Sequence, residues 1–259
     1  MRMKCFAFLF IANFAFEHSL FAQNSYNFAQ FRDETFDFIK QPAKWEGNDW
    51  LRLGLIGAGT FLAMQADQPI RDAVMKDRCY ENNVPLKFGK FWGGPYPTTI
   101  LAGAFGLHGL LADDRSSRKI GFELVQAALY SGGITTVLKV VFGRARPYTD
   151  KGSTEFRPFT FFDDGFHALP SGHATWAFAL STVLSRNAQS SVLKVLAYLP
   201  AAFTLVSRVY EDDHWSSDCL LGAVVGFVVA TWVVDLHDQK ESPVRVSSIY
   251  PLTIRINLN

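Results

Sequence analysis

The sequence is poor in charge and in cysteine, and it has no internal repeat. Charged residues make up 19% of the 259 positions, against roughly 25% in an average soluble domain, which excludes a disordered chain or a coiled coil. The 25 Lys and Arg nearly balance the 24 Asp and Glu, so we expect no nucleic-acid partner. The three cysteines, Cys5, Cys79 and Cys219, are too few and too scattered for a disulfide framework or a zinc knuckle.

The N-terminus has the pattern of an export signal. A basic stretch, residues 1–4, precedes an apolar run of about a dozen residues, 5–16, which is shorter than the roughly 20 residues of a spanning helix. We predict that residues 1–23 are a signal peptide or an N-terminal anchor. Residues 24–94 are predicted as an amphipathic and peripheral helical segment, of which residues 24–50 lie either on an apolar surface or on their own domain.

Six apolar stretches with polar connectors follow from residue 51 onward. They are rich in Ala, Gly, Leu and Val, and all six predict helices. The polar connectors carry turn signals at Asp67, at 93–95, at 113–114 and at Pro147. The stretches are residues 51–64, 97–112, 120–142, 174–184, 192–206 and 219–234.

Residues 219–234 form the stretch that most favours a membrane span. Gly222 and Gly226 lie four apart within it, a spacing that permits close helix approach in lipid. The alternative is the buried central helix of a soluble bundle. Residues 51–64 are too short to span and contain Arg52, so we expect them to lie along the membrane interface or on the bundle.

The first of three polar motifs holds Lys139 and Arg146, seven residues apart, followed by Pro147. Seven residues are close to two helical turns, so both cations can point from one helix face, with Arg146 as the last helical residue. Basic residues that flank the end of a membrane helix are the alternative interpretation.

The second motif is the segment 169–173, which ends in Ser171, Gly172 and His173 and leads directly into an apolar run. A Ser-Gly turn that opens a helix presents unpaired N–H groups and the positive end of the helix dipole, which together bind anions. We expect His173 in the first helical turn. A Ser cap with an incidental His is the alternative.

The third motif holds Arg208, His214 and Asp218. His214 and Asp218 are four residues apart, so on a helix the carboxylate can accept the Nδ1 proton and leave Nε2 as a nucleophile or base. A structural His–Asp pair is the alternative. Three cations near one point suit a tetrahedral dianion such as phosphate, and two histidines can then divide attack on phosphorus from protonation of the leaving oxygen.

The three motifs, K-x6-R-P, P-S-G-H and S-R-x5-H-x3-D, occur in this order as residues 139–147, 170–173 and 207–218. In this respect the chain resembles the type 2 phosphatidic acid phosphatase and haloperoxidase superfamily, in its bacterial membrane lipid phosphatase branch. The resemblance implies an all-α bundle of about six helices, embedded in a membrane, with the active site at one end of a four-helix core. It places the phosphatase core in residues 95–238 and leaves 239–259 as a C-terminal tail.

The resemblance also implies residue roles. His214 would be the nucleophile that forms a phosphohistidine, Asp218 would orient it, and His173 would be the general acid and then the base for water. No metal and no cofactor are expected, because the cations neutralise the charge. The expected phosphate-binding residues are Lys139, Arg146, Ser171, Gly172 and Arg208.

The expected function is metal-independent hydrolysis of a phosphomonoester or pyrophosphate on a lipid. Phosphatidic acid, phosphatidylglycerophosphate, a polyprenyl diphosphate and lipid A are the candidate substrates, and the expected place is the bacterial inner membrane with the active site facing the periplasm. The alternatives are a soluble periplasmic acid phosphatase, a vanadate-dependent haloperoxidase, and a non-catalytic phospholipid-binding or transport protein.

Other polar residues are assigned by their surroundings. The acidic segments at 163–164 and 211–213 could bind a divalent metal, but we favour carboxylates that are solvated or offset nearby cations. His167 is predicted to be a surface loop residue rather than a substrate contact. His108 is predicted to be a core or interhelix hydrogen-bonding residue rather than a ligand.

Overall fold

The computed structural model describes residues 24–76 and 83–241, and in these ranges the regular structure is helical. The all-α prediction is therefore confirmed. The leader at 1–23, Cys79 and most of the predicted C-terminal tail lie outside the described residues. The helices are α1 Phe28–Ile39, α2 Gly47–Met64, α3 Asp67–Lys76, α4 Val84–Trp92, α5 Pro95–Leu111, α6 Arg115–Phe142, α7 Gly172–Asn187, α8 Ser191–Leu196, α9 Leu199–Tyr210 and α10 Ser216–Glu241.

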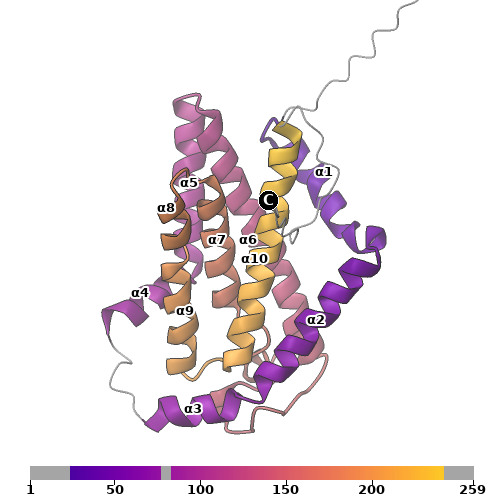
Figure 1. Ribbon diagram of the computed structural model, residues 1–259, viewed down its shortest axis with the longest axis vertical. Coiled ribbons are helices and arrows are strands. Elements are labelled where there is room, and N and C mark those ends of the chain that lie inside the picture. Colours follow the sequence, from indigo (N-terminus) through magenta and orange to yellow (C-terminus); the bar gives the residue numbers. More distant parts are fainter. Residues whose placement is uncertain (1–23, 77–82, 242–259) are drawn as a thin grey trace, which may run out of the picture.

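α5, α6, α7, α9 and α10 form an upright bundle (Figure 1). α7 packs against α6, α9 and α10, α5 packs against α6, and α4 packs against α9. α1, α2 and α3 run down the outside of this bundle, and α3 passes under the end at which α7 and α10 begin (Figure 1). All six predicted stretches are helical, although 192–206 is divided into α8 and α9 around residues 197–198.

α7 and α10 are in close contact because α10 carries glycine where the two backbones meet. A Cβ on Gly222 would lie 2.4 Å from the carbonyl oxygen of Ser171, and one on Gly226 would lie 2.1 Å from that of Thr175. Both distances are shorter than any real contact, so no larger residue fits there. The predicted close approach is confirmed, and it brings the first turn of α10 beside the first turn of α7.

α6 ends earlier than the sequence suggested, and this changes how the first motif works. Gly143 adopts a left-handed conformation (φ 56°) at the C-cap of α6, a conformation that only glycine adopts without strain. The chain therefore leaves the helix before Arg146, which is extended (φ −73°, ψ 151°). The prediction that Lys139 and Arg146 share one helix face is wrong, because Arg146 reaches the site from a loop.

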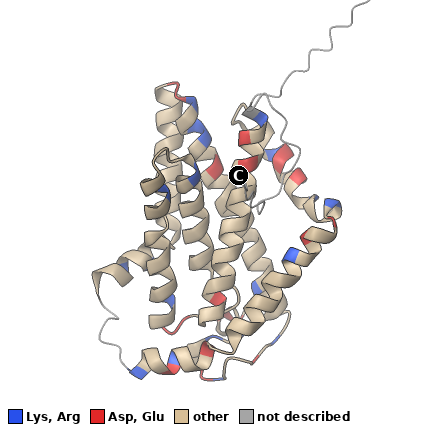
Figure 2. Cartoon of the chain, viewed as in Figure 1, with Lys and Arg blue, Asp and Glu red and all other residues tan. Residues whose placement is uncertain are grey.

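Within the part of the chain that the structure describes, three helical segments are long and apolar enough to cross a membrane: α6, the combined α8 and α9 from Ser191 to Tyr210, and α10. Large apolar side chains stay exposed along the first two segments, among them Leu129, Val137 and Leu193. Figure 2 shows the Lys, Arg, Asp and Glu residues of the bundle gathered towards its two ends. α2 is not among the three segments. It packs against α10 with most of its residues exposed.

α1 packs on the bundle through aromatic rings. Phe38 stacks on Tyr130 with ring centroids 4.5 Å apart, and it lies 5.2 Å from the ring of Trp232. Phe31 lies 6.1 Å from the same Tyr130 ring. Of the two interpretations of this segment, packing on its own domain is therefore the one that the contacts of α1 support.

Candidate active site

The candidate site lies at the end of the bundle where α6 ends, α7 begins and α10 begins (Figure 1). The three motifs, separate in sequence, meet there. The turn before α10 supplies His214, the first turn of α7 supplies His173, and α6, the loop after it and α9 each supply one cation. The predicted constellation is thus assembled by the way in which helix ends meet.

His214 is buried, with 3% of its surface exposed, and lies just before α10 rather than on it. Its Nδ1 lies 2.8 Å from the carbonyl oxygen of Ala168 and 3.8 Å from Oδ2 of Asp218. A carbonyl oxygen only accepts, so Nδ1 carries the proton and Nε2 is left with its lone pair. The expectation that Asp218 accepts this proton is wrong in detail, because the backbone of Ala168 does so.

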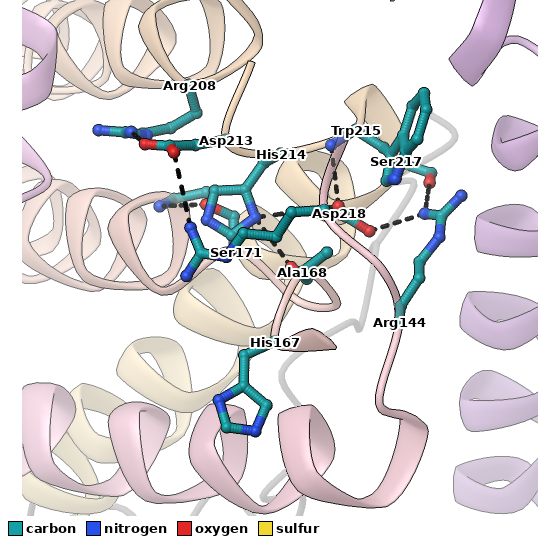
Figure 3. A network of polar contacts seen from close by, with 12 residues as sticks. Arg144, His167, Ala168, Ser171, Arg208, Asp213, His214, Trp215, Ser217 and Asp218 are labelled. Atoms are coloured by element: carbon teal, nitrogen blue, oxygen red, sulfur yellow. Dashed lines mark hydrogen bonds and ion pairs between the residues drawn. The ribbon is translucent and has the colours of Figure 1, made fainter. Parts of the chain in front are cut away.

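Asp218 instead anchors the turn that carries His214. Its Oδ2 accepts from the backbone N–H of Trp215 at 2.8 Å, and its carbonyl oxygen accepts from the N–H of Ser171 at 2.9 Å. Figure 3 shows the Asp218 carboxylate joined by dashed lines to Trp215 and to Arg144, beside the ring of His214. Asp218 therefore supplies negative charge near the imidazole and ties α10 to α7.

The second motif forms a helix N-terminus, as predicted. Ser171 is the N-cap of α7, and its side chain accepts from the N–H of Ala174. A Cβ on Gly172 would lie 4.0 Å from Cε of Lys139, which places that lysine beside the first turn of α7. His173 follows in the same turn and is partly exposed. Unpaired backbone N–H groups and a lysine thus lie together at the positive end of a helix.

The three cations are bound by carboxylates and carbonyls. Lys139 donates to the carbonyl oxygen of His167. Arg146 binds Asp164 at 2.8 Å, and Arg208 forms ion pairs with Glu211, at 2.6 Å, and with Asp213. The acidic segments singled out in the sequence therefore offset nearby cations, as we favoured. Among the residues that the structure describes, no group of three or more His, Cys, Asp or Glu side chains could hold a metal ion.

Arg208 keeps unused hydrogen-bond donors. Its side chain is 2% exposed, and its Nε and Nη1 atoms are buried without a hydrogen-bond partner. A buried charged donor without a partner costs free energy that an acceptor would recover. A tetrahedral oxyanion presents several such acceptors to one guanidinium.

The cations also hold both histidines in the neutral form. Burial lowers the pKa of His214 well below its ordinary value, and the charges of Lys139, Arg146 and Arg208 lower it further. Burial and the same cations, together with Lys90, lower the pKa of His173 to about 4. A neutral His214 is ready to act as a nucleophile, whereas His173 needs a bound anion among the cations before it gains a proton.

Two predicted histidines lie outside this cluster. His167 points away from the other labelled side chains in Figure 3, and its Nε2 lies 2.9 Å from the carbonyl oxygen of Thr160. His108 joins α5 to α6 through the Ser117 hydroxyl at 3.0 Å, and its side chain is 62% exposed. His108 is thus an interhelix hydrogen-bonding residue and not a core residue.

The sequence reasoning missed two residues behind the site. Arg144 binds Asp218 at 2.7 Å and Asp67 at 2.7 Å, and none of the three side chains is exposed. Asp67 had been assigned to a turn, but it is the first residue of α3. The available signal was an arginine between Gly143 and Ala145, directly after an apolar helix. An arginine in apolar surroundings is seldom fully buried unless it is paired with an acidic residue.

Comparison with known proteins agrees with the three motifs. Residues 121–242 match the PAP2 superfamily. The chain therefore carries a PAP2 superfamily domain, as the resemblance implied. This domain contains every predicted site residue.

Relatives and a solved structure are similar to parts of the chain. "Lipid A 1-phosphatase" of Porphyromonas gingivalis is 36% identical over 46% of this chain and 26% of its own length, so the chain spans about a quarter of that protein. "Lipid phosphate phosphatase 2" of Arabidopsis thaliana is 28% identical over 73% of this chain and 76% of its own length. The crystal structure of Aquifex aeolicus LpxE superposes with a TM-score of 0.44 at 21% identity, over 58% of this chain and 83% of that one.

Proposed function

We propose that the protein is a lipid phosphatase that hydrolyses a phosphomonoester or pyrophosphate on a membrane lipid, without a metal, through a phosphohistidine on His214. The observation that carries this proposal is the set of three cations around His214, in which buried Arg208 keeps Nε and Nη1 without partners. A phosphate dianion supplies both the charge and the acceptors that such a site requires.

The first chemical step is attack by Nε2 of His214 on phosphorus. The bond between phosphorus and the leaving oxygen breaks, its electron pair stays on that oxygen, and His173 donates a proton to it. Lys139, Arg146 and Arg208, with the N–H groups at the start of α7, bind the oxygens of the trigonal-bipyramidal transition state. Ser171 and Gly172 shape this helix N-terminus.

The second step returns the enzyme to its starting state. His173, now neutral, takes a proton from water, and the water oxygen attacks phosphorus. The bond between phosphorus and Nε2 breaks with its electron pair returning to the imidazole, and inorganic phosphate leaves. The hydrogen bond from Nδ1 to Ala168 keeps the ring in one orientation throughout both steps.

The lipid substrate is proposed from the surroundings of the site. Three helical segments can cross a membrane, and the site lies where α6 and α9 end and α10 begins. The ends of membrane-spanning helices lie at the bilayer surface, where a lipid headgroup also lies. Relatives carry the names lipid A 1-phosphatase, lipid phosphate phosphatase and undecaprenyl-diphosphatase, which supports a phosphorylated lipid. The signal peptide or N-terminal anchor predicted at 1–23 favours an inner-membrane enzyme whose site faces the periplasm.

The decisive experiment compares wild-type protein with His214→Ala in detergent containing EDTA. Phosphate release is measured from phosphatidic acid, phosphatidylglycerophosphate, a polyprenyl diphosphate, lipid A and a soluble aryl phosphate. We expect phosphate release that resists EDTA and is faster from a lipid than from the aryl phosphate. Release falls by at least about 1000-fold in the variant, because the variant lacks the nucleophile. His167→Ala is the matched control and retains activity.

Each other result points to a different function. Preference for the aryl phosphate would favour a soluble periplasmic acid phosphatase. Release that survives His214→Ala would contradict the nucleophile. No release from any substrate would favour a haloperoxidase or a phospholipid-binding protein.

A further inference from the structure

A fully buried ionic network lies behind His214 and reaches outside the matched domain. It links Asp67 on α3, Arg144 in the loop after α6, and Asp218 on α10, and the three side chains are 0% exposed. Arg144 lies at a variable position of the first motif, and Asp67 precedes residues 121–242 altogether. None of the roles assigned above includes either residue.

The donors of Arg144 are fully used. Nη1 donates to Asp218 and to the Ser217 hydroxyl, each at 2.7 Å, while Nη2 donates to Asp67 at 2.7 Å. Nε and Nη2 also donate to the carbonyl oxygen of Ser153, at 3.0 and 2.6 Å. A planar guanidinium with partners in all these directions has one position and one orientation.

Asp67 holds the start of α10 in the same way. Its Oδ1 accepts from the Ser217 N–H at 2.9 Å and from the Ser216 hydroxyl at 2.7 Å, and its Oδ2 accepts from the Ser217 hydroxyl at 2.6 Å. A carboxylate at a helix N-terminus is favoured by the helix dipole. Asp67 therefore fixes both Arg144 and the helix turn that carries Asp218.

The network ends at the proposed nucleophile. Asp218 Oδ1 binds Arg144, while Oδ2 binds the Trp215 N–H and lies 3.8 Å from Nδ1 of His214. Attack on phosphorus places positive charge on the imidazole, so a carboxylate kept ionised at this distance stabilises the developing charge. Arg144 forms an ion pair with this buried carboxylate and fixes its position.

We propose that Asp67 and Arg144 are positioning residues for His214: Asp67 orients Arg144, and Arg144 orients Asp218. α3 is thereby a part of the active site that lies outside the PAP2 match. The proposal rests on the proposed function. Arg71, one turn further along α3, adds a second contact through bidentate hydrogen bonds to Asp212, both at 2.7 Å, in the turn before His214.

The test measures kcat, KM and inhibition by orthovanadate, together with thermal unfolding, for Asp67→Asn. We expect kcat to fall about 10- to 100-fold, as on loss of an orienting partner, while KM and the vanadate inhibition constant change less than about twofold, because Lys139, Arg146 and Arg208 are untouched. Asp72→Asn is the matched control, since Asp72 is exposed on the same helix, and we expect wild-type kinetics from it.

A double variant separates positioning from folding. Asp67→Asn alone keeps Arg144 paired with Asp218, whereas Asp67→Asn with Arg144→Gln also leaves Asp218 as a buried carboxylate without this cation. We expect the double variant to unfold at a lower temperature than the single one, whereas kcat is already low in the folded single variant. A wild-type kcat in either folded variant would overturn the proposal, and so would the failure of both to fold.

The wild type and His214→Ala are assayed in parallel to distinguish the two proposals. Absence of phosphate release by the wild type would contradict the proposed function and would remove this inference with it. Release by the wild type, its loss in His214→Ala and full activity in Asp67→Asn would contradict only the positioning role.

Discussion

The two ends of the bundle both bury charge, but they do so in opposite ways. At the far end, a cluster of Glu34, Glu123, Gln126, His237 and Lys240 joins α1, α6 and α10. At the catalytic end, Lys139, Arg146 and Arg208 surround His214. Along α6, Glu123 and Lys139 are separated by sixteen residues, or about 24 Å of helix.

In the far-end cluster, every carboxylate oxygen has a hydrogen-bonding or ionic partner. Glu34 accepts from Lys240 at 2.6 Å, from Gln126 at 2.7 Å and from His237 at 3.2 Å. Glu123 lies 3.1 Å from the same histidine and accepts from Asn187 at 2.6 Å. All four carboxylate oxygens have partners, so this cluster can fasten α1 to the bundle but has little capacity for another ligand.

At the catalytic end, some buried hydrogen-bond donors have no acceptor. Arg208 keeps two buried nitrogens without partners, and the carboxylates that bind the cations are partly or largely exposed, Asp213 at 32% and Asp164 at 72%. Exposed carboxylates lose little when they move into water, so an anion can replace them. Buried charge alone therefore does not define a site, whereas a buried guanidinium with two unmatched nitrogens indicates one.

The largest expected effect comes from Arg208→Lys at the catalytic end. A lysine cannot present the guanidinium fork, so we expect kcat/KM for phosphate release to fall about 100-fold or more. Arg186→Lys is the control, since Arg186 forms an ion pair with Asp235 at the other end of α7 and is 38% exposed. A kcat/KM within twofold of wild type would remove Arg208 from the phosphate-binding set.

Glu34→Gln tests the far-end cluster. The change removes the carboxylate that Lys240 binds and leaves His237 with Glu123 alone, and we expect the free energy of unfolding to fall by about 3 kcal/mol, with kcat unchanged. Asp33→Asn, at the exposed neighbouring position, is the control for both measurements. A loss of kcat in a folded Glu34→Gln protein would contradict the division between the two ends.

The same variant has a pH signature. Burial alone would raise the pKa of Glu34, but hydrogen bonds from His237, Lys240 and Gln126 lower it from 4.5 to about 2. A lowered carboxyl pKa contributes stability above the unfolded value, and this contribution is lost as pH falls from about 4.5 towards 2. We expect thermal unfolding of the wild type to depend more strongly on pH in this window than that of Glu34→Gln.

A moderate effect is expected at His173. Its pKa is lowered to about 4 by burial and by the cations, and a phosphate dianion would offset those charges and raise the pKa. NMR titration of histidine-labelled protein, with the signal assigned through His173→Asn, gives this pKa without and with saturating inorganic phosphate. The same pKa in both titrations would contradict a shared phosphate pocket.

The smallest effect is expected from Asp164→Asn. Asp164 competes with phosphate for Arg146 but is largely exposed, so we expect inorganic phosphate to inhibit more strongly, by less than about fivefold. Asp163→Asn is the control, because an asparagine can still accept the Gly165 N–H. Weaker inhibition in Asp164→Asn would show that this carboxylate helps to hold the anion.

The sequence predicted the helices and the site residues because each depends on local signals. Apolar runs such as 219–234 and a Ser cap before His173 can be read without tertiary structure. The backbone conformation of the first motif could not be predicted from the sequence in this way. Seven-residue spacing suggested a helix face, but Gly143 ends α6 and sends Arg146 into the site from a loop.

By itself, then, the sequence determined the all-α class, the PAP2 motifs and the residue types that suit phosphate. Only the tertiary structure decided which partner each group takes. His214 donates to the Ala168 carbonyl rather than to Asp218, and Arg144 is buried against Asp67 from a helix 77 positions earlier. The physical reason is that a buried polar group must find a partner wherever packing brings one, and packing joins residues whose distance along the chain carries no signal.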